Sequence, residues 1–278
     1  MRIAIQGELG SNSHMAAREM LGDQSTGEIV PCAVSAEVFE RIESGDVDGA
    51  VLPIENSLHG SVAEHYDLLL ARPVRIAAES LMRIRHNLIA MPGVTAEQVR
   101  TVISHPVALS QCRVWLARHP QYAAMNFYDT AGSVKHIMAE GLTDTAGVAP
   151  ELAARQYGAS VLEAGIEDHA ENYTRFHLLL REPPLRPVRW PAEMQPNKSS
   201  LAFVVMHEPG TLVRALEGFA RAGVNLTKIE SRPVPGKPWE YVFFVDVRFE
   251  RLEQIDAAIE ELGSHCEMVK ELGRYVAA

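Results

Sequence analysis

The chain of 278 residues is long enough for one large domain or for two of ordinary size. With 47% hydrophobic and 22% charged residues, it has the composition of a folded globular protein and not of a disordered one. Its formal net charge of -10 argues against nucleic acid as a partner, because phosphate binding requires a basic surface.

The beginning of the chain, MRIAIQGELG, carries one basic residue and a very short apolar stretch, which is unlike a secretory signal. No apolar run in the sequence approaches the ~20 residues that a membrane-spanning helix needs. The cysteines, Cys32, Cys112 and Cys266, lie far apart and have no metal-ligand spacing. We therefore expect a cytoplasmic protein without a membrane partner, with reduced and mostly buried thiols, and we do not expect a catalytic cysteine.

The first part of the chain alternates short apolar runs with amphipathic stretches. The predicted strands are 2–6, 28–33 and 49–54, and the helices between them are 13–21 and 35–44. Ser35 is expected to cap the second helix and Gly45 to end it. Strands joined by single helices indicate right-handed crossovers and a mainly parallel sheet.

The same alternation continues beyond residue 75. The predicted strands here are 101–105, 126–129 and 159–164, and the predicted helices are 106–119, 130–140 and 151–158. The two runs suggest two lobes, 1 to about 75 and about 76 to 165. The apolar run 174–180 is expected to be a late strand that returns to the first lobe, which then also includes 166–180.

A proline-rich segment over 181–197 holds five of the chain's 16 prolines. Because proline cannot continue a helix or a central strand, we predict a linker there, between a domain over 1–180 and another over 198–278. The predicted elements of the second domain are strand 200–208, helix 209–223, strands 224–234 and 240–249, helix 251–265 and strand 266–276. The order βαββαβ is typical of a ferredoxin-like domain.

Polar side chains cluster where strands of the first domain end. The polar turns are 7–14, 53–60, 104–112, 129–132 and the pair Thr174–Arg175. The first combines glycines and serines at a helix start, which suits an anion, but it matches neither the dinucleotide fingerprint nor a P-loop. In open α/β sheets, ligands bind at the carboxyl ends of the strands. We therefore expect these turns to form one cleft between the lobes, and not five unrelated helix caps.

The residues at these turns limit the chemistry. They include neutral donors, one arginine and one glutamate, without a zinc-binding HExxH motif, a GxSxG nucleophile elbow or a lysine placed for a Schiff base. Such a set suits the binding of an anionic small molecule and the protonation of a poor leaving group, without covalent catalysis. The residues alone leave open whether binding is followed by a reaction.

The motifs GELGSNSHMAA, PIENSLHGSV, SHPVALSQC, DTAGS, GIEDHAENYTRF and NLTKIESRP follow one another along the chain. In this order the chain resembles prephenate dehydratases with a carboxyl-terminal ACT regulatory domain, over nearly its whole length. The succession of PIENS, NYTRF and ESRP is highly specific. The resemblance implies an α/β fold, with a two-lobed catalytic domain like a type II periplasmic-binding protein followed by a ferredoxin-like βαββαβ ACT domain.

The resemblance also implies an activity. The protein would be a carbon-oxygen lyase of L-phenylalanine biosynthesis, in which prephenate loses its ring carboxylate as CO2 and its ring hydroxyl as water. The product is phenylpyruvate, and no cofactor is needed. L-phenylalanine would act as a feedback inhibitor, and the protein would be a homodimer or homotetramer.

The site residues follow from the same resemblance. Thr174 matches the catalytic threonine of the TRF motif, and would donate a hydrogen bond or a proton to the departing hydroxyl. Arg175, with Asn56 and Ser57, would orient the substrate carboxylates. Further substrate contacts are expected from Ser11, Ser13, Glu55, Ser104, His105, Thr130 and Phe176.

Some positions depart from the common pattern or have an ordinary structural explanation. Glu8 stands where proline is frequent, and Asp129 where serine is frequent. We expect Asp129 to cap the helix that follows it. Glu55 is expected to fix Asn56 or a neighbouring backbone group. Gln111, like a lone histidine in a turn, is expected to have a structural role.

The ACT part carries two motifs that resemble the phenylalanine-binding motifs of the family. Their residues are Gly210, Thr211, Leu212, Val213, Asn225, Leu226, Glu230, Ser231, Arg232 and Pro233. Thr211 stands where alanine is frequent. L-phenylalanine is expected to bind at an interface between two such domains and to inhibit the distant cleft.

Two other functions remain open from the sequence. An arogenate dehydratase would act on a substrate in which an amino group replaces the keto group of prephenate. A non-enzymatic sensor would close a binding-protein-like cleft on a small anion without a reaction, since the fold alone does not decide function.

Overall fold

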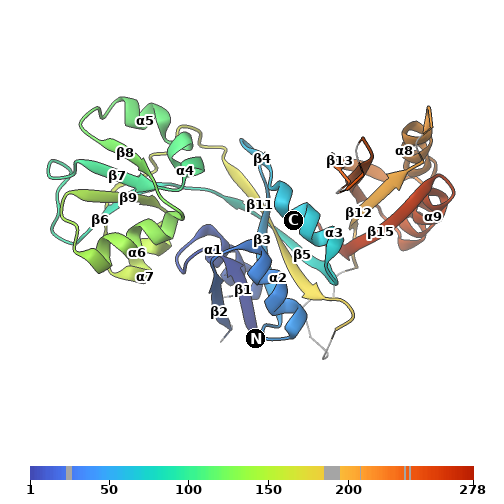
Figure 1. The fold of residues 1–278 in the computed structure, drawn as a ribbon, viewed down its shortest axis with the longest axis horizontal. Helices are drawn as coiled ribbons and strands as arrows, with labels where there is room; N and C mark the ends of the chain where they lie inside the picture. Colours follow the sequence, from blue (N-terminus) through green and yellow to red (C-terminus); the bar gives the residue numbers. More distant parts are fainter. Residues whose placement is uncertain (23–26, 185–194, 207, 235, 238) are drawn as a thin grey trace. The chain divides into compact units, whose positions relative to one another are not determined.

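The computed structural model describes residues 1–22, 27–184, 195–206, 208–234, 236–237 and 239–278 (Figure 1). Most of the predicted linker over 181–197 lies outside these residues, as do Pro235 and Pro238 between the predicted strands 224–234 and 240–249. None of the described helices is long and apolar enough to cross a membrane.

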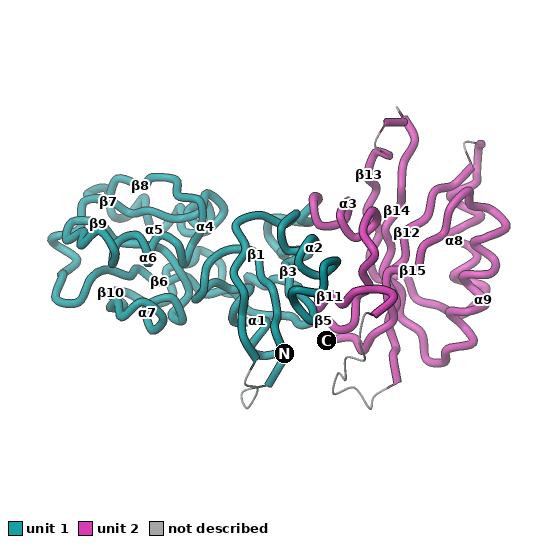
Figure 2. Tube along the Cα trace, turned by 60° about the horizontal axis from the view of Figure 1, so that its bottom comes forward, with its two compact units in different colours: residues 1–62, 80–176 teal, residues 63–79, 177–278 magenta. Residues whose placement is uncertain are grey.

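The chain forms two compact units (Figure 2). The first contains residues 1–62 and 80–176, and the second contains residues 63–79 and 177–278. The second unit thus combines the carboxyl-terminal part of the chain with a short stretch from the first domain predicted by sequence. The domain limits at 180 and 198 stay a prediction.

The first sheet has the strand order β2-β1-β3-β11-β5, and the short strand β4 also pairs with β3 (Figure 1). Its strands are β1 Arg2–Gln6, β2 Glu28–Cys32, β3 Gly49–Asn56, β4 Gly60–Ser61, β5 Val74–Arg83 and β11 Tyr173–Arg181. β1 is parallel to both β2 and β3. Because β11 lies between β3 and β5, the prediction that a late strand returns to the first lobe is confirmed.

Helices α1 Asn12–Leu21 and α2 Ser35–Ser44 connect these parallel strands. In α2, the buried residues Val38, Phe39 and Ile42 form one apolar face, as the helical period requires. Gly45 ends α2 in the left-handed conformation, with φ 75°, which confirms that prediction. The predicted cap is wrong by one residue, because Val34 occupies the cap position and Ser35 is the first residue of the helix.

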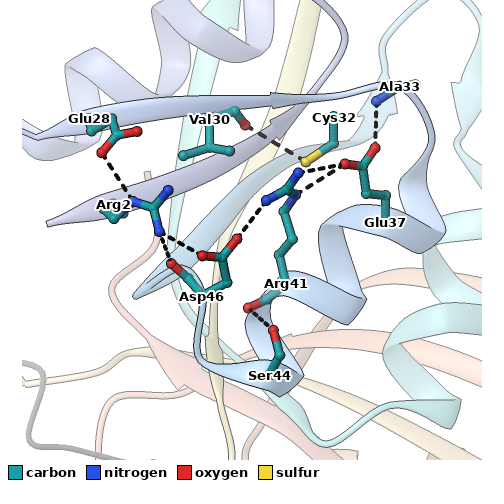
Figure 3. Close-up of polar contacts among 9 residues, drawn as sticks. All are labelled: Arg2, Glu28, Val30, Cys32, Ala33, Glu37, Arg41, Ser44 and Asp46. Atoms are coloured by element: carbon teal, nitrogen blue, oxygen red, sulfur yellow. Dashed lines mark hydrogen bonds and ion pairs between the residues drawn. The ribbon is translucent and has the colours of Figure 1, made fainter.

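A surface network of ion pairs ties these elements together (Figure 3). The Asp46 carboxylate forms ion pairs with Arg2 Nη1 at 2.7 Å and with Arg41 Nη1 at 2.6 Å. Arg41 Nη2 also forms an ion pair with Glu37 Oε1 at 2.9 Å. The hydrogen bonds from Arg2 and then Arg41 lower the pKa of Asp46. Its contribution to stability is therefore present above the ordinary carboxyl pKa and is lost as the pH falls through the lower, folded-state value. These side chains are partly solvent-exposed, so we expect the network to contribute little to the free energy of unfolding.

The second sheet has the strand order β10-β6-β9-β7-β8. Its strands are β6 Asn87–Ala90, β7 Thr101–Ser104, β8 Ala123–Asn126, β9 Thr145–Ala149 and β10 Ser160–Ala164. β7 is parallel to β8 and β9, whereas β6 is antiparallel to β9 and β10. The strand predicted over 126–129 is three residues too late, since those residues form the turn that precedes the next helix.

Helices α6 Thr130–Glu140 and α7 Glu151–Tyr157 agree with the predicted ranges, but the helix predicted over 106–119 is interrupted. It forms α4 Pro106–Gln111 and α5 Arg113–Ala117, separated at Cys112. The Asp168 carboxylate accepts hydrogen bonds from the backbone N–H groups of Val114, at 2.9 Å, and Trp115, at 3.2 Å. Because Asp168 satisfies amides that a continuous helix would bond internally, a new helix begins there.

The carboxyl-terminal part of the second unit has an antiparallel sheet of order β13-β14-β12-β15 and two helices. The elements are β12 Lys198–Val205, α8 Thr211–Arg221, β13 Asn225–Pro233, β14 Tyr241–Arg248, α9 Leu252–Gly263 and β15 Cys266–Tyr275. Buried Phe203, Phe219, Val245 and Ile255 belong to the core between the sheet and the helices. The predicted βαββαβ order is confirmed.

Helix α3 Ala63–Ala71 and the first part of β5 belong to the same unit. Lys270 Nζ donates to the carbonyl oxygens of Leu69, Leu70 and Arg72, at 2.7 to 3.2 Å, where α3 ends. β15 also approaches β5 very closely at Gly273, where a Cβ atom would lie 2.2 Å from the carbonyl oxygen of Ile76. Only glycine fits this contact without a backbone shift.

A buried ionic cluster lies beside this contact. Lys198 Nζ is 2.7 Å from Glu79 Oε2 and 3.0 Å from Glu79 Oε1. Both side chains are almost inaccessible, 7% and 3% exposed. Asp246 lies 4.0 Å from the lysine and accepts a 2.6 Å hydrogen bond from Ser200. The cluster joins β5 to β12 and β14 within the second unit.

Candidate active site

The first unit contains a cavity of about 510 Å³ that is lined by residues of both sheets and their connections. Four of the predicted polar turns contribute to its wall, and so does Thr174, which lies near the start of β11 and not in a turn as predicted. The predicted site residues found there are Ser11, Ser13, Asn56, His105, Thr130, Thr174 and Phe176. The carboxyl ends of strands β1, β3 and β7 therefore meet around one volume, as parallel strands allow.

Two helices begin at the cavity wall. Ser11 is the N-cap of α1, and its hydroxyl accepts a hydrogen bond from the His14 backbone N–H at 3.3 Å. Thr130 is the first residue of α6. Amino ends of helices favour negative charge, because their first N–H groups have no partner within the helix. The cavity thus presents amide and hydroxyl donors to an anion without a lysine or arginine among the lining residues described.

Asn56 has one fixed orientation in this wall. Its Oδ1 accepts hydrogen bonds from the backbone N–H groups of Leu58, at 3.0 Å, and His59, at 3.1 Å. Its Nδ2 must therefore face the other way, where it donates to Asn172 Oδ1 at 2.7 Å and to Thr174 Oγ1 at 2.9 Å. The Asn56 amide therefore bonds both to the turn that follows β3 and to the residues at the start of β11.

Thr174 receives this hydrogen bond on its hydroxyl oxygen. A threonine hydroxyl has one proton to donate, and here that proton is not required by Asn56. The residue is 8% exposed and lines the cavity, so its hydroxyl proton can be donated into the cavity. This arrangement gives the cavity one oriented O–H donor.

Three residues that the sequence argument did not assign to the site extend the network. Gln111 Nε2 lies 3.4 Å from Asn56 Oδ1 and 3.2 Å from His59 Nδ1, and Gln111 Oε1 lies 2.7 Å from His86 Nε2. All of them line the cavity. His59 belongs to the same PIENSLHG turn as Asn56, and this neighbourhood was an available signal. His86 precedes β6, a strand that the sequence argument did not predict.

Arg175 and Glu55 lie elsewhere. Neither lines the cavity, and Arg175 Nη2 forms an ion pair with Glu55 Oε2 at 2.8 Å. Successive side chains of a strand point to opposite faces of the sheet, so Thr174 and Arg175 of β11 cannot both face the cavity. The same alternation separates Glu55 from Asn56 in β3. The expectation that Arg175 clamps a substrate carboxylate does not fit this geometry.

We therefore expect Arg175→Lys to leave KM within about twofold and to lower the free energy of unfolding by about 1 kcal/mol, because a lysine cannot reproduce the guanidinium hydrogen bonds. Steady-state kinetics and thermal unfolding measure the two effects. Arg155→Lys, at an exposed pair with Glu151, is the control and should change neither. A large rise in KM with unchanged stability would show instead that Arg175 binds the substrate.

Two serines that were predicted to contact the substrate, Ser104 and Ser57, instead form hydrogen bonds within the protein. The Ser104 side chain is fully buried, and its hydroxyl donates to the carbonyl oxygen of Val148 at 2.6 Å. The Ser57 hydroxyl accepts from the Tyr173 backbone N–H at 3.0 Å, and the Ser57 N–H donates to the Tyr173 carbonyl oxygen at 2.8 Å. These serines join strand ends to their neighbours, and neither lines the cavity.

Asp129 is the N-cap of α6, and its Oδ1 accepts from the Gly132 N–H at 2.7 Å, which confirms the predicted cap. Burial raises the pKa of its carboxyl group. Glu8 accepts hydrogen bonds from the Tyr128 hydroxyl at 3.0 Å and from Lys135 Nζ at 2.9 Å. Glu8, where proline is frequent, therefore connects the turn after β1 to the start of α6 and adds no charge to the cavity wall.

The cysteines are thiols of low reactivity. Burial raises the pKa of Cys32 to about 11 and that of Cys266 to about 11, and it raises the pKa of Cys112 still further. Little thiolate is available at neutral pH. Within the described ranges, no group of three or more His, Cys, Asp or Glu side chains could hold a metal ion.

A second cavity of about 510 Å³ lies in the carboxyl-terminal part of the second unit. It is lined by the first predicted regulatory motif, Gly210, Thr211, Leu212 and Val213, and by aromatic residues that include Trp239 and Tyr241. Thr211 is buried, and its hydroxyl oxygen lies 2.7 Å from the carbonyl oxygen of Met206 and 2.8 Å from that of Glu208, which share its one proton. Thr211, which stands where alanine is frequent, therefore bonds the main chain that precedes α8 and has no hydroxyl proton left for the cavity.

The second predicted regulatory motif does not line that cavity within one chain. Its residues, Asn225, Leu226, Glu230, Ser231, Arg232 and Pro233, belong to β13 at the edge of the sheet. Arg232 forms an ion pair with Asp67 of α3 at 2.7 Å.

The fold and the first cavity define a class of protein. Two α/β sheets enclose a volume lined by hydroxyl, amide and imidazole groups, and a domain with an antiparallel sheet follows. This is a two-lobed α/β domain with a fold of the periplasmic-binding-protein type, joined to a ferredoxin-like domain.

Comparisons with known proteins assign the family. The family pattern described as prephenate dehydratase matches residues 3–184, and the ACT domain pattern matches residues 199–264. An Arabidopsis thaliana protein named arogenate dehydratase/prephenate dehydratase 2, chloroplastic, is 38% identical over 285 residues, which cover 99% of this chain and 72% of that protein. The chain belongs to the prephenate dehydratase family and is a lyase with a carboxyl-terminal ACT domain.

Solved structures agree on the fold. Prephenate dehydratase from Arthrobacter aurescens, in complex with L-Phe, aligns with a TM-score of 0.88 and 28% identity, over 100% of this chain and 90% of that chain. A protein described as GqqA, a novel type of quorum quenching acylase, aligns with a TM-score of 0.87 and 32% identity, over 100% of this chain and 98% of that chain. One fold therefore carries two described activities among its relatives.

Proposed function

We propose that this protein converts prephenate to phenylpyruvate, with Thr174 as the hydrogen-bond donor to the departing hydroxyl. The proposal rests on the contact from Asn56 Nδ2 to Thr174 Oγ1 at 2.9 Å, which occupies an acceptor site of the hydroxyl and leaves its proton for the substrate. Family membership provides the reaction class.

The reaction requires little from the protein. The bond from the ring to the carboxylate breaks, its electron pair completes the aromatic ring, and the bond to the hydroxyl breaks at the opposite carbon. Hydroxide leaves as water after it gains a proton. Formation of the aromatic ring provides the driving force, so one oriented donor is sufficient assistance.

The charge of the cavity favours prephenate over arogenate. Prephenate carries a keto group where arogenate carries an ammonium group. Among the described lining residues there is no carboxylate to pair with that ammonium, and Glu55 is occupied by Arg175. A desolvated and unpaired ammonium is costly, whereas a keto group accepts hydrogen bonds from the amide and hydroxyl donors present.

Turnover of both substrates by the purified full-length protein tests the proposal. Phenylpyruvate formed from prephenate absorbs in alkali, and phenylalanine formed from arogenate is measured by chromatography. We expect kcat/KM for prephenate to exceed that for arogenate by at least about tenfold. A preference for arogenate would contradict the proposed substrate but not the family.

The geometry gives less support to an acylase. Ser110 Oγ lies 3.0 Å from His59 Nε2, which resembles a nucleophile beside a base. However, Gln111 Nε2 donates to His59 Nδ1, so the proton of a neutral ring is on Nε2. The Ser110 hydroxyl donates to the carbonyl oxygen of Val107 at 2.7 Å. In this arrangement, His59 is a donor to the serine and not its base.

We also propose that L-phenylalanine binds in the second cavity and inhibits the enzyme. Apolar and aromatic side chains in this cavity suit the phenyl ring of phenylalanine, and the amino end of α8 suits the ligand's carboxylate. The solved relative in complex with L-Phe supports the same ligand. Since β13 is an edge strand that carries the second motif, pairing of two chains along it would bring both motifs to one ligand.

Val213 offers a test, because it lines the second cavity and is 58% exposed. A glutamate there would repel the ligand carboxylate, and we expect Val213→Glu to raise the phenylalanine concentration for half inhibition by about tenfold or more. Met125→Glu, at an equally exposed apolar residue of the other unit, is the control. If the wild-type rate does not respond to millimolar phenylalanine, the regulatory proposal is wrong.

A further inference from the structure

His86 is buried in the wall of the first cavity, and its main chain is fixed on both sides. The exposed fraction of the residue is 1%. Its N–H donates to Glu167 Oε2 at 3.0 Å, and its carbonyl oxygen accepts from the Ile166 N–H at 2.9 Å. The ring therefore has little freedom to move.

The ring has one side-chain partner among the described residues. His86 Nε2 lies 2.7 Å from Gln111 Oε1, and no hydrogen-bond partner is found for Nδ1. A carbonyl oxygen accepts only, so Nε2 must carry the proton. Burial lowers the pKa of His86, which keeps the ring neutral, with its unshared electron pair on Nδ1. His86 is thus an N–H donor directed at Gln111.

The orientation of the Gln111 amide is set independently by Asn56, and the His86 donor agrees with it. With Oε1 held by His86, the NH2 group faces Asn56 Oδ1 and His59 Nδ1. A reversed amide would place its oxygen against Asn56 Oδ1, which the backbone N–H groups of Leu58 and His59 fix as an acceptor. The Gln111 main chain is held as well, since its carbonyl oxygen accepts from the Asp168 N–H at 2.7 Å.

We infer that His86 is a positioning residue: through Gln111 it adds to the backbone contacts that hold Asn56, and Asn56 in turn leaves the Thr174 hydroxyl proton for the substrate. The path runs from the imidazole N–H to the Gln111 amide, from there to Asn56 Oδ1, and through Asn56 Nδ2 to Thr174 Oγ1. His86 and Gln111 belong to the part of the first unit that holds the second sheet, whereas Asn56 and Thr174 belong to the first sheet. The inference rests on the proposed role of Thr174.

Two substitutions of similar size and polarity separate positioning from support of the fold. The amide of glutamine reaches the place of imidazole Nε2, while the shorter amide of asparagine reaches that of Nδ1. We expect His86→Gln to retain kcat within about threefold and His86→Asn to lower it by about 10- to 100-fold, because a small misplacement of a reacting group is expensive. KM should change much less than kcat.

A double substitution tests the path itself. In a Gln111→Leu background, His86→Asn should lower kcat by less than about twofold further, because the intermediate link is already absent. The same Gln and Asn substitutions at His119 are the control. That histidine bonds the Trp115 carbonyl oxygen through Nδ1 at 2.8 Å and lies outside the cavity wall, so both should leave kcat unchanged.

The experiment uses the full-length protein and whichever of prephenate and arogenate the wild type dehydrates. The choice of substrate therefore tests the proposed function, and the variants test His86. Unfolding temperatures are measured for every variant. The inference is overturned if the Gln and Asn variants have equal kcat, or if the loss at position 86 is fully retained in the Gln111→Leu background.

Discussion

Replacing Thr174 by alanine is expected to lower kcat by about 10²- to 10⁴-fold, with folding preserved. The substitution removes the oriented O–H donor of the cavity and also leaves Asn56 Nδ2 without one of its acceptors. Thr174→Ser keeps the hydroxyl and should retain activity within about tenfold. Steady-state kinetics with prephenate, beside circular dichroism, measures both effects.

The matched control for this experiment is Thr145→Ala. Thr145 is also a strand residue, in β9, and it is 7% exposed compared with 8% for Thr174. Its hydroxyl donates to Asp144 and lies outside the cavity wall. Similar losses of stability in the two alanine variants, with a loss of kcat in one only, would assign the effect to catalysis. Near-normal kcat in Thr174→Ala would contradict the proposed role.

Replacing Lys198 by methionine is expected to lower the free energy of unfolding by about 3–5 kcal/mol. The substitution leaves the Glu79 carboxylate, 3% exposed, without the nearest positive charge, and Asp246 lies in the same cluster. A buried charge without compensation is far more costly than a buried pair is stabilising. Urea unfolding followed by circular dichroism gives the difference.

The double variant Lys198→Met, Glu79→Met should recover much of this loss, because two apolar side chains replace two charges. Lys237→Met is the control, since its pair with Glu240 at 2.9 Å is solvent-exposed. We expect it to change the free energy of unfolding by less than about 1 kcal/mol. A double variant no more stable than the single one would show that repulsion at Glu79 is not the cause.

Much of the fold could be predicted from local patterns. Helices such as α6 and α7 have clear apolar periods and strong end signals, and the late strand β11 was recognised from its apolar run. The interruption at Cys112 could not be predicted, because it depends on a carboxylate 56 positions further along the chain, at Asp168. Partners this distant leave no trace in the local sequence.

The location of the candidate site could be predicted from the sequence, but not all of the residues that line it. Turns at strand ends identify the cavity, but they do not say which face of a strand each side chain takes. Thr174 and Arg175 are adjacent in the motif, and they lie on opposite faces of β11. His86 was missed since a histidine before an apolar strand gives no signal by itself. Its relevance comes from one contact with Gln111.

The close approach of Gly273 to Ile76 has a consequence for protein engineering. The ACT domain and residues 63–79 share one compact unit, in which Gly273 of β15 leaves no room for a side chain against β5, and Lys270 bonds the carbonyl groups at the end of α3. Chimaeras that exchange ACT domains between relatives at the predicted linker over 181–197 would separate these matched surfaces. A functional exchange would have to transplant α3 and the first half of β5 together with the ACT domain.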